Sequence, residues 1–289
     1  MHLPWAASHA MVPTVRVHDD GRLEVLFSPR DDAGRSRVAR AWVDLSRGEA
    51  IVEDEPVLDI GELGAFDEAG VNPSCLVRDG DRWLLYYIGW QVGVTVPFAT
   101  TIGLAISVDG GRSFERLSDG PVIGRSRDNP YLATSPWVLV DDGRWRMWYA
   151  SGVRWETTST GPKPYYHVRH AESSDGVRWD VSGPVCIDFA DAAEHAIARP
   201  CVIRDADCYR MWFSHRGERY RIGCAESTDG LTWNRAPASA GLDPGAEGWD
   251  GEMVEYPAVF DFGGRRHMLY NGNDYGRTGI GHALYEEPR

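Results

Sequence analysis

The sequence of 289 residues lacks the patterns that mark several classes of protein. Its five cysteines are odd in number and form no CxxC pair, which argues against both a disulfide framework and a zinc site. No apolar run approaches the length of a membrane span. The first residues, MHLPWAASHAMVP, have neither the basic start nor the uninterrupted apolar stretch of a secretory signal. We therefore expect a cytoplasmic protein without a membrane partner.

The chain also has fewer positively charged than negatively charged residues. The chain has 30 Lys and Arg against 43 Asp and Glu, which gives a net charge of −13. Such a surface repels nucleic acids and anionic membranes, so no nucleic-acid partner is expected. Helical periodicity, linkers and low-complexity tracts are missing as well, and this predicts a single domain over residues 1–289.

What the sequence does contain is a repeat. Five segments align on prolines that recur at intervals of 57 to 64 residues, by subtraction of their numbers: Pro13, Pro73, Pro136, Pro200 and Pro257. Each segment has a proline-led apolar run, a turn rich in Asp and Gly, and a second run with alternating large apolar residues. This pattern is typical of a β-hairpin.

A third strand is expected after each hairpin. In the middle three segments it leads into an Asp-Gly turn, followed by an aromatic residue that starts a fourth strand: Phe114, Trp179 or Trp233. Five consecutive units of this kind predict an all-β fold, a five-bladed β-propeller with four-stranded antiparallel blades around a central channel. Only eight residues precede the first strand, so the closure of the fifth blade is left open.

The first strand of each propeller blade lines the channel, so residues near the repeat prolines converge there. A purely structural repeat would not need different polar residues at these equivalent positions. Their variation therefore indicates a small-molecule site. The candidate substrate-binding residues are His9, Asn72, Trp90, Thr134, His167, Arg199, His215, Arg216, Arg221, Asn271, Asn273 and Asp274.

The repeats carry a family resemblance. The turns AESSDGVRW and AESTDGLTW and the strand start Glu255-Tyr256-Pro257 resemble those of the five-bladed glycoside hydrolase superfamily, families 32, 43, 62, 68 and 130. The chain is most similar to bacterial glycosidase-like proteins of polysaccharide or secondary-metabolite loci. Because families 32 and 43 place their general acid two residues before a proline, the resemblance implies that Glu255 is a proton donor.

The second carboxylate departs from the family pattern. The families place an Asp directly before proline in earlier blades, whereas this chain has Val12, Asn72, Ser135 and Arg199 there. Glycoside hydrolysis needs two carboxyl groups, one protonated and one ionised. The candidates for the second catalytic residue are therefore Asp67, Glu194 and Glu252.

Basic residues suggest a further possibility. Arg199, Arg216 and Arg221, with His215, would suit an anion site, with Arg199 and Arg221 holding a phosphate or an anionic part of the substrate. Family 130 enzymes resemble this arrangement, and the resemblance implies attack by inorganic phosphate. No HxH or HExxH spacing is present, so neither a metal site nor a cofactor is predicted.

The sequence thus predicts a carbohydrate-active enzyme that cleaves or transfers a glycosyl bond, with an anionic or phosphorylated sugar as one option. A phosphorylase using inorganic phosphate is an alternative. A non-catalytic sugar-binding propeller and a repurposed lyase or metal-dependent biosynthetic enzyme also stay open, as do the sugar, the stereochemical course and the oligomeric state.

Overall fold

The computed structural model describes residues 3–285, and almost all of its regular structure is β-strand. The all-β class predicted from the sequence is confirmed. Strands pair with their neighbours along the chain in five successive groups, which we call sets 1 to 5.

Set 1 comprises β1 (Ser8–Val17), β2 (Leu23–Arg30), β3 (Ala39–Asp44) and β4 (Glu49–Val52). Set 2 comprises β5 (Gly70–Asp79), β6 (Arg82–Val92), β7 (Phe98–Ser107) and β8 (Glu115–Arg116). Set 3 comprises β9 (Ala133–Asp141), β10 (Arg144–Thr158), β11 (Gly161–Ser173) and β12 (Val185–Ile187). Set 4 comprises β13 (Ala196–Arg204), β14 (Tyr209–Arg216), β15 (Tyr220–Ser227) and β16 (Asn234–Arg235). Set 5 comprises β17 (Glu255–Phe262), β18 (Arg265–Asn271) and β19 (Ile280–Leu284).

Pairing within each set is antiparallel. One parallel pair, Tyr166 with Ala196, joins sets 3 and 4 into one sheet. Set 5 has three strands within residues 3–285. The two short helical elements are η1 (Ala238–Ala240) and α1 (Asn273–Gly276). No helix among the described residues is long and apolar enough to cross a membrane.

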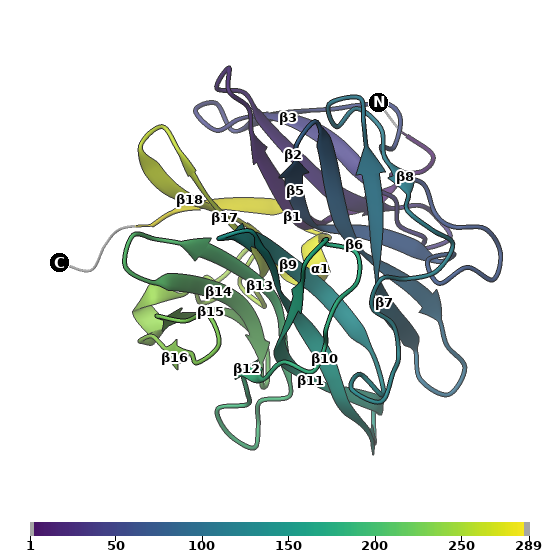
Figure 1. Ribbon diagram of the computed structural model, residues 1–289, viewed down its shortest axis with the longest axis vertical. Coiled ribbons are helices and arrows are strands. Elements are labelled where there is room, and N and C mark those ends of the chain that lie inside the picture. Colours follow the sequence, from purple (N-terminus) through teal and green to yellow (C-terminus); the bar gives the residue numbers. More distant parts are fainter. Residues whose placement is uncertain (1–2, 286–289) are drawn as a thin grey trace.

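The first strands of the five sets contact each other in a cycle. β1 contacts β5, β5 contacts β9, β9 contacts β13, β13 contacts β17, and β17 returns to β1. Figure 1 shows these strands and α1 around the middle of the molecule, with β8, β12 and β16 toward the rim. A hydrophobic cluster fills each junction between neighbouring sets, including the junction of set 5 with set 1.

A β-bulge interrupts each first strand at its repeat proline or, in set 2, just after it. In four of the five sets the residue before the proline is left-handed, with φ between 52° and 55°: Val12, Ser135, Arg199 and Tyr256. Such a bulge bends the strand and re-aims its side chains. The same bulge therefore recurs around the cycle, and Asn72 in set 2 is the member without the left-handed backbone.

The Asp-Gly turns hold neighbouring sets together. The Gly176 carbonyl of set 3 accepts a hydrogen bond from the Tyr86 hydroxyl of set 2 at 2.7 Å, and the Gly230 carbonyl of set 4 accepts one from Trp148 Nε1 of set 3 at 2.8 Å. The Gly111 carbonyl of set 2 accepts one from Arg40 of set 1. These turns therefore have a structural role, as their repetition suggested.

Candidate active site

Glu255 stands apart from the other buried acids of the chain. It begins β17 opposite Asn271 and has no exposed surface. The four other buried acids among the described residues each form an ion pair with arginine: Glu24, Asp31, Asp67 and Glu194. Within residues 3–285, neither carboxyl oxygen of Glu255 has a hydrogen-bond partner. Burial raises the pKa of Glu255 well above its ordinary value, the positive charge of Arg216 opposes this, and the negative charge of Asp274 adds to it.

The charge of Glu255 acts on four tyrosines, which we call the tyrosine cluster: Tyr166 on β11, Tyr220 on β15, Tyr256 on β17 and Tyr275 on α1. Burial is the largest cause that raises the pKa of each hydroxyl, and the charge of Glu255 raises all four further. The hydroxyls of Tyr166 and Tyr220 lie 2.5 Å apart, and the rings of Tyr220 and Tyr275 meet edge to face at 6.2 Å. Three of these tyrosines are half-buried, so the cluster reaches the surface although Glu255 does not.

Arg216 links the cluster to the carboxyl group. As the last residue of β14, it donates a hydrogen bond from Nη1 to the Tyr275 hydroxyl at 3.2 Å. Its guanidinium carbon lies 5.2 Å from the centre of the Tyr220 ring. The arrangement therefore combines a carboxyl group whose burial favours the protonated form, aromatic faces and a cation, which is suited to binding and protonating a sugar derivative.

The turn α1 carries Asp274 and Tyr275 in consecutive left-handed conformations, with φ of 53° and 57°. The side chain of Asp274 is exposed and lies 3.4 Å from Arg277. The charges of Asp274 and Arg30 both act on the half-buried His9, whose pKa is lowered mainly by burial. Asp274 and His9, both predicted as binding residues, thus lie close to the Glu255 site.

The side-chain amides of Asn271 and Asn273 form hydrogen bonds with backbone groups. The Asn271 amide accepts a hydrogen bond from Val12 N at 2.8 Å and donates to the carbonyls of Ala10 and Gly279 at 2.6 and 3.2 Å. Asn273 accepts from the backbone N–H groups of Glu252 and Met253 and donates to the Gly248 carbonyl. Both amides therefore hold the chain beside Glu255. Glu252, one of the three candidates for the second catalytic carboxylate, is exposed.

The other two carboxylates predicted as catalytic, Asp67 and Glu194, each form an ion pair with an arginine. Asp67 accepts hydrogen bonds from Tyr87 at 2.9 Å and Arg116 at 2.8 Å. Glu194 accepts from Arg235 at 2.7 and 3.0 Å and contacts His215 Nδ1 at 2.7 Å. Burial alone would raise the pKa of Glu194, but these partners lower it to about 2.

Arg199 and Arg221 are not brought together. Arg199 is completely buried in the cycle of first strands, where it donates to the carbonyls of Ser74 and Pro13 and to their neighbouring hydroxyls. Arg221 is exposed and pairs with Asp243 at 3.2 Å. It lines a cavity of about 300 Å³ with Glu194 and His215. The predicted anion site over Arg199 and Arg221 is therefore not formed in this structure.

The remaining predicted residues lie outside the tyrosine cluster. Ser36 accepts a hydrogen bond from Trp90 Nε1 at 3.0 Å and donates to Asn72 at 2.9 Å. His167 Nδ1 lies 3.1 Å from Asp188. Thr134 is half-buried on β9. No group of three or more potential metal ligands is found among residues 3–285.

The candidate site residues chosen from the sequence did not include Arg30 or the tyrosine cluster. Tyr256 had a usable signal, because it stands directly before a repeat proline. In the sequence, Tyr275 lies at the end of a predicted strand, where a lone aromatic is as often a packing residue. Tyr166 and Tyr220 come from the starts of third strands, where the repeats gave no position that points to the axis.

Comparison with known proteins begins with two relatives. The chain is 45% identical over 287 residues to Uncharacterized protein MT1551 of Mycobacterium tuberculosis strain CDC 1551 / Oshkosh, covering 98% of this chain and 95% of the relative. The same values hold for Uncharacterized protein Rv1502 of strain ATCC 25618 / H37Rv. The chain belongs to the MT1551 and Rv1502 family. No family model matches this member of the MT1551 and Rv1502 family.

Solved structures extend the comparison. The chain is similar to the BT0996 RGII complex, with a TM-score of 0.79 and 19% identity, covering 98% of this chain and 89% of the other. A thermostable family-43 glycoside hydrolase gives a TM-score of 0.74 at 14% identity, with coverages of 97% and 91%. A GH130 structure from work on mannoside phosphorylases and glycoside hydrolases gives 0.69 at 16%, with coverages of 99% and 89%. These values show that this member of the MT1551 and Rv1502 family shares the fold of these glycoside hydrolase structures.

Proposed function

We propose that the chain is one five-bladed β-propeller domain over residues 1–289, with sets 1 to 5 as its blades. The cycle of contacts among the first strands supports this proposal. The hydrophobic clusters at the five junctions support it independently, because an open row of five sheets would have only four such junctions. The site of Glu255 then lies where the first strand of the fifth blade begins.

The protein is proposed to be a carbohydrate-active enzyme that cleaves or transfers a glycosyl bond, with Glu255 as the proton donor. The observation that carries this proposal is the environment of Glu255: a fully buried carboxyl group, without an arginine partner, whose charge acts on the tyrosine cluster. Such a carboxyl group stays protonated near neutral pH and can donate its proton to the oxygen of a leaving group. The tyrosine faces suit the apolar side of a sugar ring.

Asp274 is the best-supported ionised partner for this acid. It is exposed, on the turn next to the tyrosine cluster, and its charge acts on Glu255. Asp67 and Glu194 are both tied by arginine, and each would have to leave its ion pair to act on a substrate. In the proposed reaction Glu255 protonates the departing oxygen while Asp274 stabilises positive charge at the sugar or activates water.

Phosphorolysis is the second candidate. It is favoured by Arg216, a cation beside the proposed acid that donates its hydrogen bond to a neutral tyrosine hydroxyl. If an arginine holds inorganic phosphate, the phosphate itself attacks the sugar and no carboxylate base is needed.

The test compares Glu255→Gln with wild type on glycosides of one sugar whose leaving groups differ in basicity. A general acid contributes about 10²–10⁴-fold to rate. We expect losses of that size for basic alkyl or sugar leaving groups, and much smaller losses for nitrophenyl glycosides, because nitrophenolate departs without protonation. Assays with and without inorganic phosphate separate hydrolysis from phosphorolysis.

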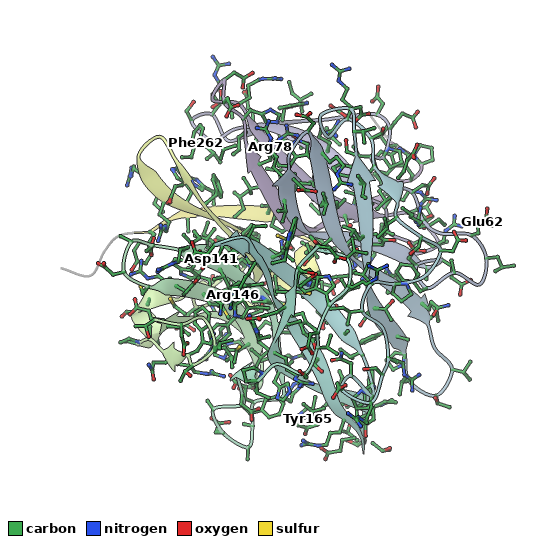
Figure 2. All side chains as sticks on the ribbon, viewed as in Figure 1. Glu62, Arg78, Asp141, Arg146, Tyr165 and Phe262 are labelled. Atoms are coloured by element: carbon green, nitrogen blue, oxygen red, sulfur yellow. The ribbon has the colours of Figure 1, made fainter. Side chains whose placement is uncertain are left out.

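Glu62→Gln is the matched control, because Glu62 is exposed at the rim of the molecule (Figure 2) and distant in the fold from β17. Equal losses for all leaving groups would contradict the role of Glu255 as an acid. Sugar binding by wild type and Glu255→Gln without turnover by either would identify a non-catalytic sugar-binding protein.

A further inference from the structure

Two arginines end the second strands of the two sets that adjoin set 5. Set 5 lies between set 4 and set 1 in the cycle of first strands, because β17 contacts both β13 and β1. Arg216 ends β14, the second strand of set 4, and Arg30 ends β2, the second strand of set 1. Their pairing partners, Ala196 and Ser8, lie just before the bulges of the two neighbouring first strands. The two arginines therefore occupy corresponding places in the sets on either side of β17, where the charge of Arg216 acts on Glu255 and that of Arg30 on the adjacent Tyr256.

Neither guanidinium is neutralised. Among residues 3–285, no carboxylate lies within ion-pair distance of Arg30 or Arg216, although the chain carries 43 acidic residues. The Nε of each is buried and has no acceptor among the described atoms. The side chain of Arg30 makes no hydrogen bond there, and that of Arg216 makes one, to Tyr275. A buried donor without an acceptor is costly, so a site of this kind favours an incoming oxyanion.

Arg199 provides the contrast within the same molecule. It is more deeply buried than either, but both of its Nη atoms donate to backbone carbonyls and hydroxyls. The Nε of Arg199, like theirs, has no acceptor among residues 3–285, but its Nη donors are used to tie strands together. Arg30 and Arg216 do not use theirs in this way, and both are half-buried, which leaves their guanidinium groups within reach of a ligand.

We propose that Arg30 and Arg216 together bind an oxyanion, a carboxylate or a phosphate, next to Glu255. The inference rests on the proposed function, for which it names the substrate class: either the glycoside bears the anionic group or inorganic phosphate is the second reactant. Arginine is the side chain best suited to this, because its planar fork matches two oxygens of a carboxylate or phosphate.

The bound anion also acts on the proposed acid. The positive charge of Arg216 favours the ionised form of Glu255. An anion seated on Arg216 cancels that effect and adds a negative charge nearby, so Glu255 holds its proton more firmly once the ligand is bound. The ligand thereby helps to set the protonation state that the acid needs.

The experiment measures dissociation constants by calorimetry for four probes: glucuronate, glucose 6-phosphate, glucose and inorganic phosphate. We expect at least one anionic probe to bind wild type more tightly than glucose does. Arg30→Gln and Arg216→Gln should each weaken that binding about 10- to 100-fold, the value of a hydrogen bond to a charged group. Arg178→Gln, which changes an exposed arginine on the turn after β11, should leave it unchanged.

Each outcome bears on one proposal. Binding of an anionic sugar that phosphate does not displace assigns the anion to the sugar, and binding of phosphate alone assigns it to the second reactant. Failure of every anionic probe to bind, or equal binding by both variants and wild type, overturns the inference. If neutral glycosides are cleaved in a Glu255-dependent way and neither arginine variant changes kcat/KM, the proposed function stands without the anion site. If anion binding depends on both arginines but Glu255→Gln leaves turnover intact, the anion site stands without the proposed acid.

Discussion

Glu255 differs from the other buried acids because no neighbouring side chain forms an ion pair or hydrogen bond with its carboxyl group among the described residues. Glu24 is as deeply buried, but Arg40 Nε lies 2.8 Å from one oxygen and His18 Nε2 lies 2.7 Å from the other, so its ionised form is compensated. Glu255 has tyrosine hydroxyls nearby and one cation that bonds elsewhere. Folding therefore favours the neutral acid at Glu255, which lacks the partners that Glu24 has.

This difference predicts how stability depends on pH. The pKa of Glu255 is higher in the folded than in the unfolded chain, so the unfolded chain releases this proton first as pH rises. The stabilisation is complete below the unfolded pKa and is lost as pH rises through the folded pKa, at about 1.4 kcal/mol per pH unit. Glu255→Gln cannot titrate, so its stability relative to wild type should increase between pH 5 and pH 8. Urea unfolding at several pH values measures this, and parallel pH profiles for the two proteins would rule it out.

Part of the site was predictable at the residue scale. The Glu-x-Pro pattern located Glu255 because the repeat fixed its place on a first strand. The sequence could not rank Asp67, Glu194 and Glu252 against each other, since ion pairing with Arg116 or Arg235 depends on contacts across the fold. For the same reason Arg199 resembled a ligand-binding residue, although both of its Nη atoms donate to backbone carbonyls and hydroxyls of sets 1 and 2.

At the scale of elements, the hairpins and Asp-Gly turns followed from the sequence, but the left-handed bulges did not. A residue before proline is normally pushed toward extended conformations. Val12 and Tyr256 are nevertheless left-handed, a conformation that costs about 1–2 kcal/mol for an ordinary residue. The packing of the first strands around the axis overrides this local preference. A single sequence shows only the local preference, so the left-handed bulges could not be predicted from it.

The turn α1 permits a prediction at this scale, because Gly adopts the left-handed conformation of Tyr275 without strain. Tyr275→Gly should therefore keep the path of the turn, remove one wall of the tyrosine cluster and admit water to Glu255. The pKa of Glu255 should then fall toward its ordinary value, and the loss of stability with rising pH should shrink. Tyr275→Phe is the matched control, since it keeps the ring and should preserve most of that pH dependence. The prediction fails if urea unfolding gives the same pH profile for Tyr275→Gly and wild type.

At the scale of the whole molecule, the two ends of the chain are joined by side chains. Turn carbonyls link sets 1 with 2, 2 with 3 and 3 with 4. Trp212 occupies the place of Trp148 in set 4, but its Nε1 has no acceptor among residues 3–285. No strand of set 1 pairs with a strand of set 5 within that range. The hydrophobic junction and the amide of Asn271 therefore connect sets 5 and 1.

Asn271→Ala tests this closure. The substitution would leave the Val12 N–H and the Ala10 carbonyl without their hydrogen-bond partners, 259 and 261 positions away along the chain. Since each buried group left unpaired costs about 1–3 kcal/mol, we expect a loss of about 2–4 kcal/mol in the free energy of unfolding. The exposed Asn234 provides a control variant, Asn234→Ala, which should change stability by less than about 0.5 kcal/mol. Hydrogen exchange at Val12 should accelerate in Asn271→Ala before exchange in set 3 does, because opening begins where the ends meet. An Asn271→Ala protein as stable as wild type would mean that the hydrophobic junction alone holds the two ends together.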